Sequence, residues 1–203
     1  MPNWVFTQME VRGSEEEVKR FRDGIGEKGF CESYFPCPQE LRDTLSGWSS
    51  DQAVQAEREK QYEANIAKYG YRDWYDWSCA NWGTKWGDCD FQMDDPYDKG
   101  DTWVSHAQYN TAWSPAEGAL KTISAMFPTL LFITEFDEEG GHFAGVTAYR
   151  DGVIIYDNGF VPADYEGELD WENDDSIESF HSWKEAKMEF YLRDMEDTLE
   201  NLV

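Results

Sequence analysis

The stretch Thr129–Asp157, TLLFITEFDEEGGHFAGVTAYRDGVIIYD, decides the fold, because it holds three apolar segments separated by two turns. Thr129–Asp137 is rich in apolar and β-branched residues, which favours a strand. His142–Tyr149 and Val153–Asp157 have the same character. Asp151-Gly152 between them suits a two-residue hairpin turn, in which both residues need positive φ. The stretch therefore predicts an antiparallel meander of three strands.

Two more strands and several helix starts are readable upstream of this meander. Asn3–Arg12 and Thr102–Trp113 carry aromatic and β-branched residues and are expected to be strands. Capping patterns begin at Ser14, at Ser114 with proline in the first helical position, and at Ser182. They predict helices near residues 15–25, 51–68, 115–127 and 183–200.

The order of these elements is typical of an α+β domain with a ferredoxin-like core. We expect a mostly antiparallel sheet with helices on one face. Residues 1–160 would form the domain, interrupted by a helical insertion at about 30–100. Residues 161–203 would add a loop and a C-terminal helix packed on the same domain. The part of this tail from 164 to 178, DYEGELDWENDDSIE, is interpreted as an acidic loop anchored by Trp171.

The segment Trp74–Trp86, WYDWSCANWGTKW, contains four tryptophans in thirteen residues. Between Gly70 and Gly83, which suit helix C-terminal caps, one helical stripe is formed by Tyr71, Trp74, Tyr75, Ser78 and Trp82. We therefore expect Trp74 and Trp82 to be buried. Lys85 and Trp86 lie beyond the glycine and are predicted to form a surface feature. A cation–π contact would hold Lys85 there, or the lysine would face an anionic ligand.

The same segment carries a family resemblance. Asn81–Asp90, NWGTKWGDCD, preceded by Lys68–Trp77, KYGYRDWYDW, resembles the signature of the YubB-type ferredoxin-like domains of phage and plasmid proteins. Tyr34–Leu41 and Trp113–Pro128 resemble further segments of that family. The resemblance covers about residues 3–160. It implies the ferredoxin-like fold and an origin in a mobile element, and it brings no catalytic residues to carry over.

The charge of the chain restricts its partners. The formal net charge is −25, from 42 acidic and 17 basic residues. Such a chain repels phosphate backbones, so direct nucleic-acid binding is disfavoured, and basic proteins or metal ions are the expected partners. Solubility alone is the alternative explanation. The sequence shows neither a membrane-spanning run nor a signal peptide, which predicts a cytoplasmic protein. No pattern specifies an oligomeric state.

Patterns for catalysis and cofactors are weak. The four cysteines form no CxxC pair and are expected to be free thiols. No phosphate-binding loop or nucleophile elbow occurs, so we expect no catalytic residues, no cofactor and no enzyme activity. The acidic segment Asp88–Asp101 has carboxylates suited to calcium or magnesium. It lacks the EF-hand spacing, so a solvated loop is favoured and no metal site is predicted.

The main hypothesis is an acidic accessory protein that binds and inhibits a basic host protein. The partner would be a nucleic-acid-binding enzyme of a restriction or CRISPR defence system, with the acidic surface acting as a nucleic-acid mimic. The carboxylates expected to contact the partner are Asp94, Asp95, Asp98, Asp170, Glu172, Asp174, Asp175, Glu185, Glu189, Glu196 and Glu200.

Two alternatives remain open. One is a module that binds a nucleotide or single-stranded nucleic acid on the sheet, with bases stacked on the strand face of Phe143, Thr147 and Tyr149. The other is a metal-dependent enzyme that uses the Asp88–Asp101 segment.

Overall fold

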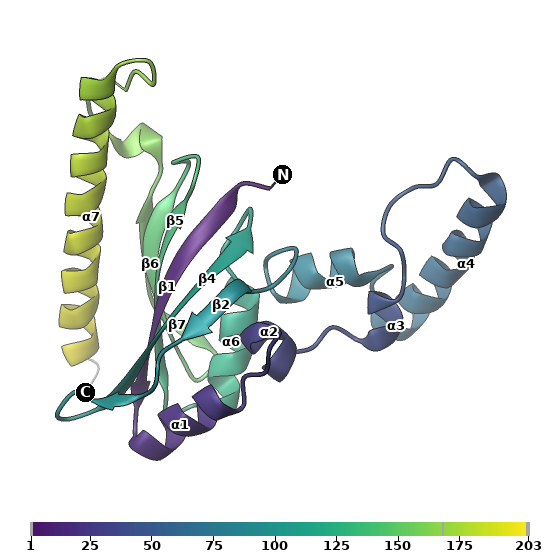
Figure 1. The fold of residues 1–203 in the computed structure, drawn as a ribbon, viewed down its shortest axis with the longest axis horizontal. Helices are drawn as coiled ribbons and strands as arrows, with labels where there is room; N and C mark the ends of the chain where they lie inside the picture. Colours follow the sequence, from purple (N-terminus) through teal and green to yellow (C-terminus); the bar gives the residue numbers. More distant parts are fainter. Residues whose placement is uncertain (1, 168, 202–203) are drawn as a thin grey trace.

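The computed structural model describes residues 2–167 and 169–201. Within these residues, seven strands form one antiparallel sheet (Figure 1). The order across the sheet is β2-β4-β1-β5-β6-β7, and β3 pairs with β4 outside this path. The strands are β1 (Trp4–Gly13), β2 (Cys89–Met93), β3 (Tyr97–Asp98), β4 (Trp103–Ala112), β5 (Leu131–Glu138), β6 (Ala144–Arg150) and β7 (Val153–Phe160).

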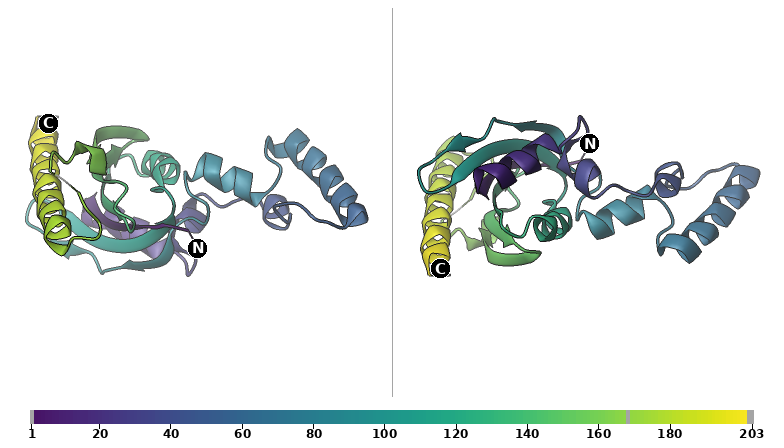
Figure 2. Two further views of the ribbon diagram at one scale, coloured as in Figure 1. Left: turned by 90° about the horizontal axis from the view of Figure 1, so that it is seen from above. Right: turned by 90° about the horizontal axis from the view of Figure 1, so that it is seen from below.

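The helices lie in three places around this sheet (Figures 1 and 2). They are α1 (Glu15–Asp23), α2 (Gly29–Tyr34), α3 (Gln39–Arg42), α4 (Gln52–Tyr69), α5 (Trp74–Asn81), α6 (Glu117–Met126) and α7 (Asp174–Glu200), with a short 3-10 helix at Pro162–Asp164. This arrangement confirms the predicted α+β class and ferredoxin-like fold. None of the helices in the described residues has both the length and the apolar content needed to cross a bilayer.

The topology follows from the strand registers. β1 pairs antiparallel with β4 on one side and with β5 on the other. β4 and β5 therefore run parallel to each other, and α6 connects them across β1, as in the split βαβ unit of ferredoxin-like folds. The meander β5-β6-β7 follows as predicted, and its hairpin turn uses Asp151 and Gly152 with φ of 50° and 78°. The short strands β2 and β3 lie in the segment Asp88–Asp101, for which the sequence predicted a solvated loop.

Side chains alternate across the sheet and build two separate cores. The first face of β1 carries Val5, Met9 and Val11, which are buried. On this face Phe21 of α1, Phe30 of α2 and Ile123 of α6 belong to the same core. On the second face, α7 packs over β6 and β7. That second core consists of Leu131, Ile133, Ala144, Val146, Ala148, Tyr156, Phe160, Met188, Tyr191, Met195 and Leu199.

The insertion forms an arm. α3, α4 and α5 extend away from the sheet, and α4 lies farthest from α7 (Figures 1 and 2). A buried amide holds the arm together: Asn65 Nδ2 of α4 donates to Thr44 Oγ1 at 2.9 Å and to the carbonyl of Arg72 at 2.7 Å. At its base, the amide of Ala119 in α6 donates to the carbonyl of Trp82 at 3.2 Å.

Local signals placed some helix starts correctly and others incorrectly. Ser14 accepts a hydrogen bond from the amide of Glu17 at 3.3 Å, so the first predicted cap is confirmed. The prediction at Ser114 was wrong: α6 begins at Glu117, and Ser114 Oγ donates to the carbonyl of Gly83 at 2.5 Å. Ser114 does not cap the helix, because its hydroxyl instead binds the loop after α5 to the segment that follows β4.

The last helix begins nine residues earlier than predicted. Asn173, not Ser182, is its cap, and its side chain accepts from the amides of Asp175 and Ser176 at 3.0 and 3.3 Å. Residues 174–178 therefore belong to α7 and not to the acidic loop. The added turns bury Phe180, which lies against Trp171 and Trp183.

The tryptophan segment forms a helix with a buried side, but its buried residues differ in part from those predicted. Trp77, Ser78 and Trp82 are buried, whereas Trp74 is half-buried and packs against the first core. The prediction that Trp82 is buried is therefore confirmed. The prediction for Trp74 was wrong, because Trp77 is the second buried tryptophan. Gly83 follows the helix with φ of 84°, as its predicted role at the helix end requires.

Candidate functional site

α7 covers only part of the second face of the sheet. The rest, over β2, β4, β1 and the edge of β5, carries polar side chains in register. Gln92, Gln108, Gln8 and Glu135 stand side by side on β2, β4, β1 and β5, because each is the direct cross-strand partner of the next. Gln108 Nε2 donates to Gln92 Oε1 at 3.2 Å. Three carboxamides and one carboxylate thus form a row across four strands.

A second row runs beside the first. Phe6 of β1 pairs with Asn110 of β4 and with Asp137 of β5. Asn110 Nδ2 donates to Asp90 Oδ2 at 3.3 Å, and Asp90 has a φ of 53° at an irregularity in β2. Phe6 is 51% exposed, so an apolar ring stands among polar groups that can donate and accept hydrogen bonds.

The two rows line a groove with a volume of about 470 Å³. Glu135 and Asp137 also border a second hollow of about 460 Å³ between β5 and α7. Because both hollows share these two carboxylates, we treat them as one site and call it the groove. Its wall on α7 is formed by His181, Lys184, Glu185, Met188, Glu189 and Leu192.

The centre of the groove is a carboxylate pair with one lysine. Lys184 Nζ donates to Asp137 Oδ2 at 2.5 Å, and Lys184 is largely buried. Burial raises the pKa of Glu135 above its ordinary value, and the neighbouring Asp137 carboxylate raises it further. Asp137 Oδ1 is buried and has no hydrogen-bond partner within the described residues. Both side chains are partly exposed in the groove, so the pair can accept hydrogen bonds from a cationic group that enters it.

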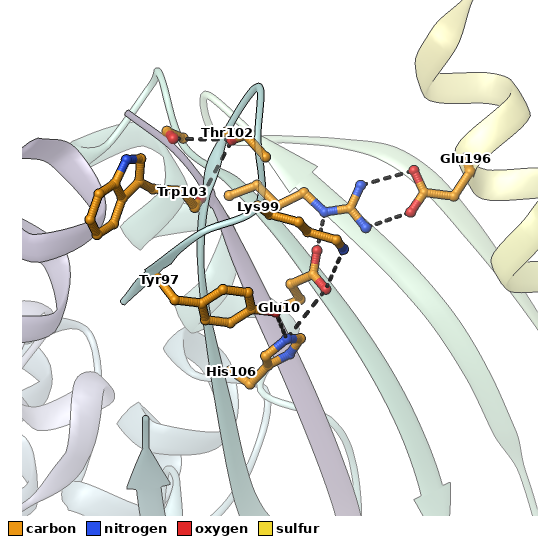
Figure 3. Close-up of polar contacts among 9 residues, drawn as sticks. Glu10, Tyr97, Lys99, Thr102, Trp103, His106 and Glu196 are labelled. Carbon is orange, nitrogen blue, oxygen red and sulfur yellow. Dashed lines mark hydrogen bonds and ion pairs between the residues drawn. The ribbon is translucent and has the colours of Figure 1, made fainter. Parts of the chain in front are cut away.

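An ion-pair network closes one end of the second face (Figure 3). Arg12 of β1 makes a bidentate pair with Glu196 of α7, at 2.9 and 2.5 Å, and a further pair with Glu10. Lys99 and His106 approach Glu10 at 3.7 and 3.8 Å. Burial lowers the pKa of Arg12, but its hydrogen bonds to Glu196 and Glu10 outweigh burial and raise it. The hydrogen bond from Arg12 lowers the pKa of Glu196.

Aromatic side chains stand at the opposite end of β1. Trp4 lies on the same side of the strand as Phe6 and Gln8, as the alternating burial of β1 shows. Its ring centroid is 5.9 Å from that of Trp86, and Trp86 is 6.5 Å from Trp113. The predicted surface feature at Lys85 and Trp86 is thus located beside the groove.

The structure distributes the eleven predicted partner-binding acids over several places. Glu185 and Glu189 line the groove, and Asp94 lines a smaller hollow next to it. Glu196 is paired with Arg12, and Asp95 pairs with Arg22 at 2.5 Å. The remaining predicted acids are exposed away from the groove: Asp98, Asp170, Glu172, Asp174, Asp175 and Glu200.

The sequence prediction missed the centre of the groove. Glu135 and Asp137 were interpreted only as part of an apolar strand. Their signal was the alternation Ile133, Glu135, Asp137, which puts two acids on one face of a strand that is otherwise apolar. The row of carboxamides had no local signal, because Gln8, Gln92 and Gln108 meet only through strand pairing.

The proposed base-stacking surface was placed on the wrong face. Tyr149 is 1% exposed and belongs to the first core, and Thr147 is also buried. Phe143 packs against Phe136 with ring centroids 6.2 Å apart. Thr147 and Tyr149 are therefore enclosed by the fold, and Phe143 is half-buried, so the three side chains do not form an exposed platform for a base.

The metal hypothesis also finds no support in the geometry. Among residues 2–167 and 169–201, no three His, Cys, Asp or Glu side chains converge in a way that could hold a metal ion. Asp88 is buried and accepts from the amides of Phe30 and Cys31 at 2.7 and 3.0 Å. Its carboxylate is thus occupied by the first turn of α2.

These features define an α+β protein with a ferredoxin-like sheet and a polar, partly acidic groove. Residues 81–181 match the model of a family described as the ferredoxin-like domain in Api92-like protein. A similar solved structure is that of protein Api92 from Yersinia pseudotuberculosis, with 9% identity and a TM-score of 0.50. The similarity covers 81% of this chain and 100% of that one, and at this identity it concerns the fold alone.

No curated protein matches the chain. The comparisons support a ferredoxin-like family under the Api92-like description, not under the YubB-type description expected from the motifs. The matched range starts in the tryptophan segment and ends within α7, so it extends beyond residue 160, where the motif resemblance stopped.

Proposed function

We propose that the protein binds an extended, basic segment of a partner protein in the groove. The observation that carries this proposal is the row of Gln92, Gln108 and Gln8, which ends in the carboxylate of Glu135, with Asp137 beside it in the second row. Carboxamides can donate to and accept from the peptide groups of an extended chain. Carboxylates on the same surface would pair with arginine or lysine side chains of that chain.

Electrostatics favour the same class of partner. The groove has acids on both walls, Asp90 on the sheet and Glu185 and Glu189 on α7, and Lys184 is already paired with Asp137. The net charge of −25 would attract a basic segment over distances of about a Debye length, ~8 Å at physiological salt. Association should therefore be fast at low salt and should weaken as salt increases.

The experiment is a titration with an arginine-rich nonapeptide, followed by calorimetry at low and high salt. Glu135→Gln combined with Asp137→Asn should weaken binding about tenfold or more. The matched control is Glu57→Gln combined with Glu59→Gln, which removes the same charge from the exposed surface of α4. The control should change binding less than about twofold. Equal losses in both variants, or no binding by the wild type, would refute the groove as the site.

We further propose that the partner is a host protein and that binding inhibits it. The motif resemblance implies a phage or plasmid origin, and the nucleic-acid-binding enzymes of restriction and CRISPR systems carry the basic surfaces that this groove would suit. Full nucleic-acid mimicry needs carboxylates gathered on one face. Exposed acids also occur on α1 and α4, so the proposal relies on the groove rather than on the whole surface.

Capture from host lysate can identify this partner if the groove variant serves as a second bait. A basic protein retained by the wild type at low salt, and lost both at high salt and with Glu135→Gln/Asp137→Asn, would meet the proposal. Retention by both baits would place the contact elsewhere on the chain.

A further inference from the structure

Three aromatic rings surround the ammonium group of Lys85. Its Nζ lies 4.4 Å from the ring centroid of Trp86, 5.0 Å from that of Trp113 and 5.6 Å from that of Tyr75. All three distances fall within the roughly 6 Å over which a cation is attracted to the face of an aromatic ring. We call Tyr75, Trp86 and Trp113 the aromatic cage.

The aromatic cage is exposed although it is rigidly held. Trp86 and Trp113 are 41% and 45% exposed, and their rings are inclined by 27°. The loop from α5 to Trp86 is fixed to the residue before Trp113 by Thr84, whose Oγ1 donates to the carbonyl of Ala112 at 2.9 Å and accepts from its amide at 3.1 Å. Large exposed rings on a fixed backbone are typical of recognition sites.

The backbone of Trp113 is strained. Its φ is 70°, in the left-handed region that bulky residues rarely adopt. Its amide donates to the carbonyl of Asn3 at 2.9 Å, which fixes this conformation. Strain of this kind costs free energy and is concentrated at functional sites. Here its effect is to hold the Trp113 ring next to Lys85, outside both cores.

Lys85 occupies the aromatic cage without a carboxylate. Among the ion pairs of the described residues, none involves Lys85, although the protein has 42 acidic residues. A lysine side chain is flexible and can withdraw into water without breaking a strong pair. The rings would then present an empty cation site in a strongly negative protein.

We propose that the aromatic cage is a binding site for an organic ammonium group, and that Lys85 is a built-in occupant which the ligand displaces. The chemistry is that of cation–π recognition, in which ring faces replace water around the cation. An anionic ligand would need Lys85 and would meet the repulsion of the surrounding acids. The two ligand classes therefore predict opposite effects when the lysine charge is removed. This inference concerns a site separate from the groove and does not depend on the proposed function.

The test is a titration with tetramethylammonium chloride, followed by NMR of the tryptophan indole N–H signals. Sodium chloride at the same concentration corrects for ionic strength. Lys85→Met empties the aromatic cage while keeping an unbranched apolar stem, and it should bind the cation about tenfold more tightly than the wild type. In this background Trp86→Ala should abolish binding. Trp113→Gly should do the same, and glycine suits the positive φ if an alanine at residue 86 impairs folding.

The matched control is Trp48→Ala in the Lys85→Met background, because Trp48 is 76% exposed in the segment before α4. It should leave the affinity unchanged. Unchanged binding after Lys85→Met, or equal effects of Trp48→Ala and Trp86→Ala, would overturn the proposal. If the wild type binds adenosine monophosphate and Lys85→Met abolishes this binding, the proposal is overturned in favour of an anion site.

A second arm identifies the source of the ammonium group. A short peptide with trimethyllysine is compared with the same peptide containing lysine and with free choline. Tighter binding of the methylated peptide supports a modified side chain as the ligand. Equal binding of choline and the methylated peptide supports a small cation. If neither peptide nor choline binds the Lys85→Met variant, the proposal is contradicted, and this outcome does not depend on what the groove binds.

Discussion

At the scale of single residues, Asp88 shows how a buried charge is held. Its carboxylate accepts two amides at the start of α2 and is 6% exposed. Gly29 allows this approach, because a Cβ there would lie 2.0 Å from Asp88 Oδ2. Burial raises the pKa of Asp88 from 3.8 to about 6, although the amides of Cys31 and Phe30 act in the opposite direction.

This pKa predicts a stability that falls as pH rises. The folded protein holds the Asp88 proton more tightly than the unfolded chain does, so the stabilisation is complete below pH 3.8 and is lost through pH 6. The change is on the order of 3 kcal/mol. Asp88→Asn cannot ionise. The free energy of unfolding of the wild type, measured against this variant by urea denaturation, should therefore drop by most of that amount between pH 4 and 7.

Asp98→Asn is the control for this prediction, because Asp98 is exposed at the end of β3. The difference in the free energy of unfolding between this variant and the wild type should change little across the same pH range. A flat difference for Asp88→Asn as well would show that the folded carboxyl titrates at its ordinary pKa.

Residue identities alone could not reveal this contact. Asp88 appeared to belong with the acids that follow it, up to Asp101, since all of them are carboxylates in one short segment. The structure separates it from them, because Gly29 and the amides of α2 come from a part of the chain almost sixty residues away. A burial that depends on such a distant partner leaves no pattern in the local sequence.

At the scale of elements, two caps compete for the start of α7. Asn173 makes both cap hydrogen bonds, whereas Ser182 lies in the exposed middle of the helix. Asn173→Ala should lower the free energy of unfolding by about 1 kcal/mol. Ser182→Ala should change it by less than about 0.5 kcal/mol. Thermal denaturation of both variants checks the pair, and a larger loss for Ser182→Ala would move the start of the helix back to residue 183.

The reason for the earlier start is tertiary. Ser182 and Glu185 satisfy a local capping pattern, but a helix beginning there would leave Phe180 outside it. In the structure Phe180 is 1% exposed and contacts Tyr165 and Trp183. Burial of the Phe180 ring favours a helix that begins after Asn173. Local capping rules do not take this burial into account.

The Arg12–Glu196 pair tests how α7 is fastened to β1. Glu196→Gln should lower the free energy of unfolding by about 1 kcal/mol at neutral pH, since the pair is bidentate but partly exposed. Because Arg12 lowers the pKa of Glu196, this contribution is present above the ordinary carboxyl range and is lost as pH falls through the lowered value. Urea denaturation at several pH values measures it. Glu200→Gln, exposed one turn further along α7, should show little effect.

At the scale of the whole molecule, the order of elements was predictable and the binding surface was not. Strands and helices follow from local alternation and spacing, so β1, β4 and the meander were expected close to their observed bounds. The groove needs the registers that bring Gln8 beside Glu135 and Gln108. A register depends on pairing between distant strands, which a single sequence does not specify.

The net charge of −25 makes a prediction for the entire fold. Repulsion among carboxylates opposes the compact state, while ion pairs such as Arg12–Glu196 favour it, and salt screens both. Because acids outnumber bases by 42 to 17, repulsion should dominate. Raising sodium chloride from 0.02 to 0.5 M shortens the Debye length from about 20 to about 4 Å. The urea midpoint of the wild type should therefore rise.

Urea is the suitable denaturant for this measurement because it is uncharged and leaves the ionic strength unchanged. The same series with Glu196→Gln separates the two opposing contributions. Both proteins should gain stability in high salt, and the difference between them should shrink, because salt also weakens the Arg12–Glu196 pair. A wild-type midpoint that falls with salt would mean that the ion pairs outweigh the repulsion. The acidic surface would then be electrostatically compensated within the chain, with little attraction left for a basic partner.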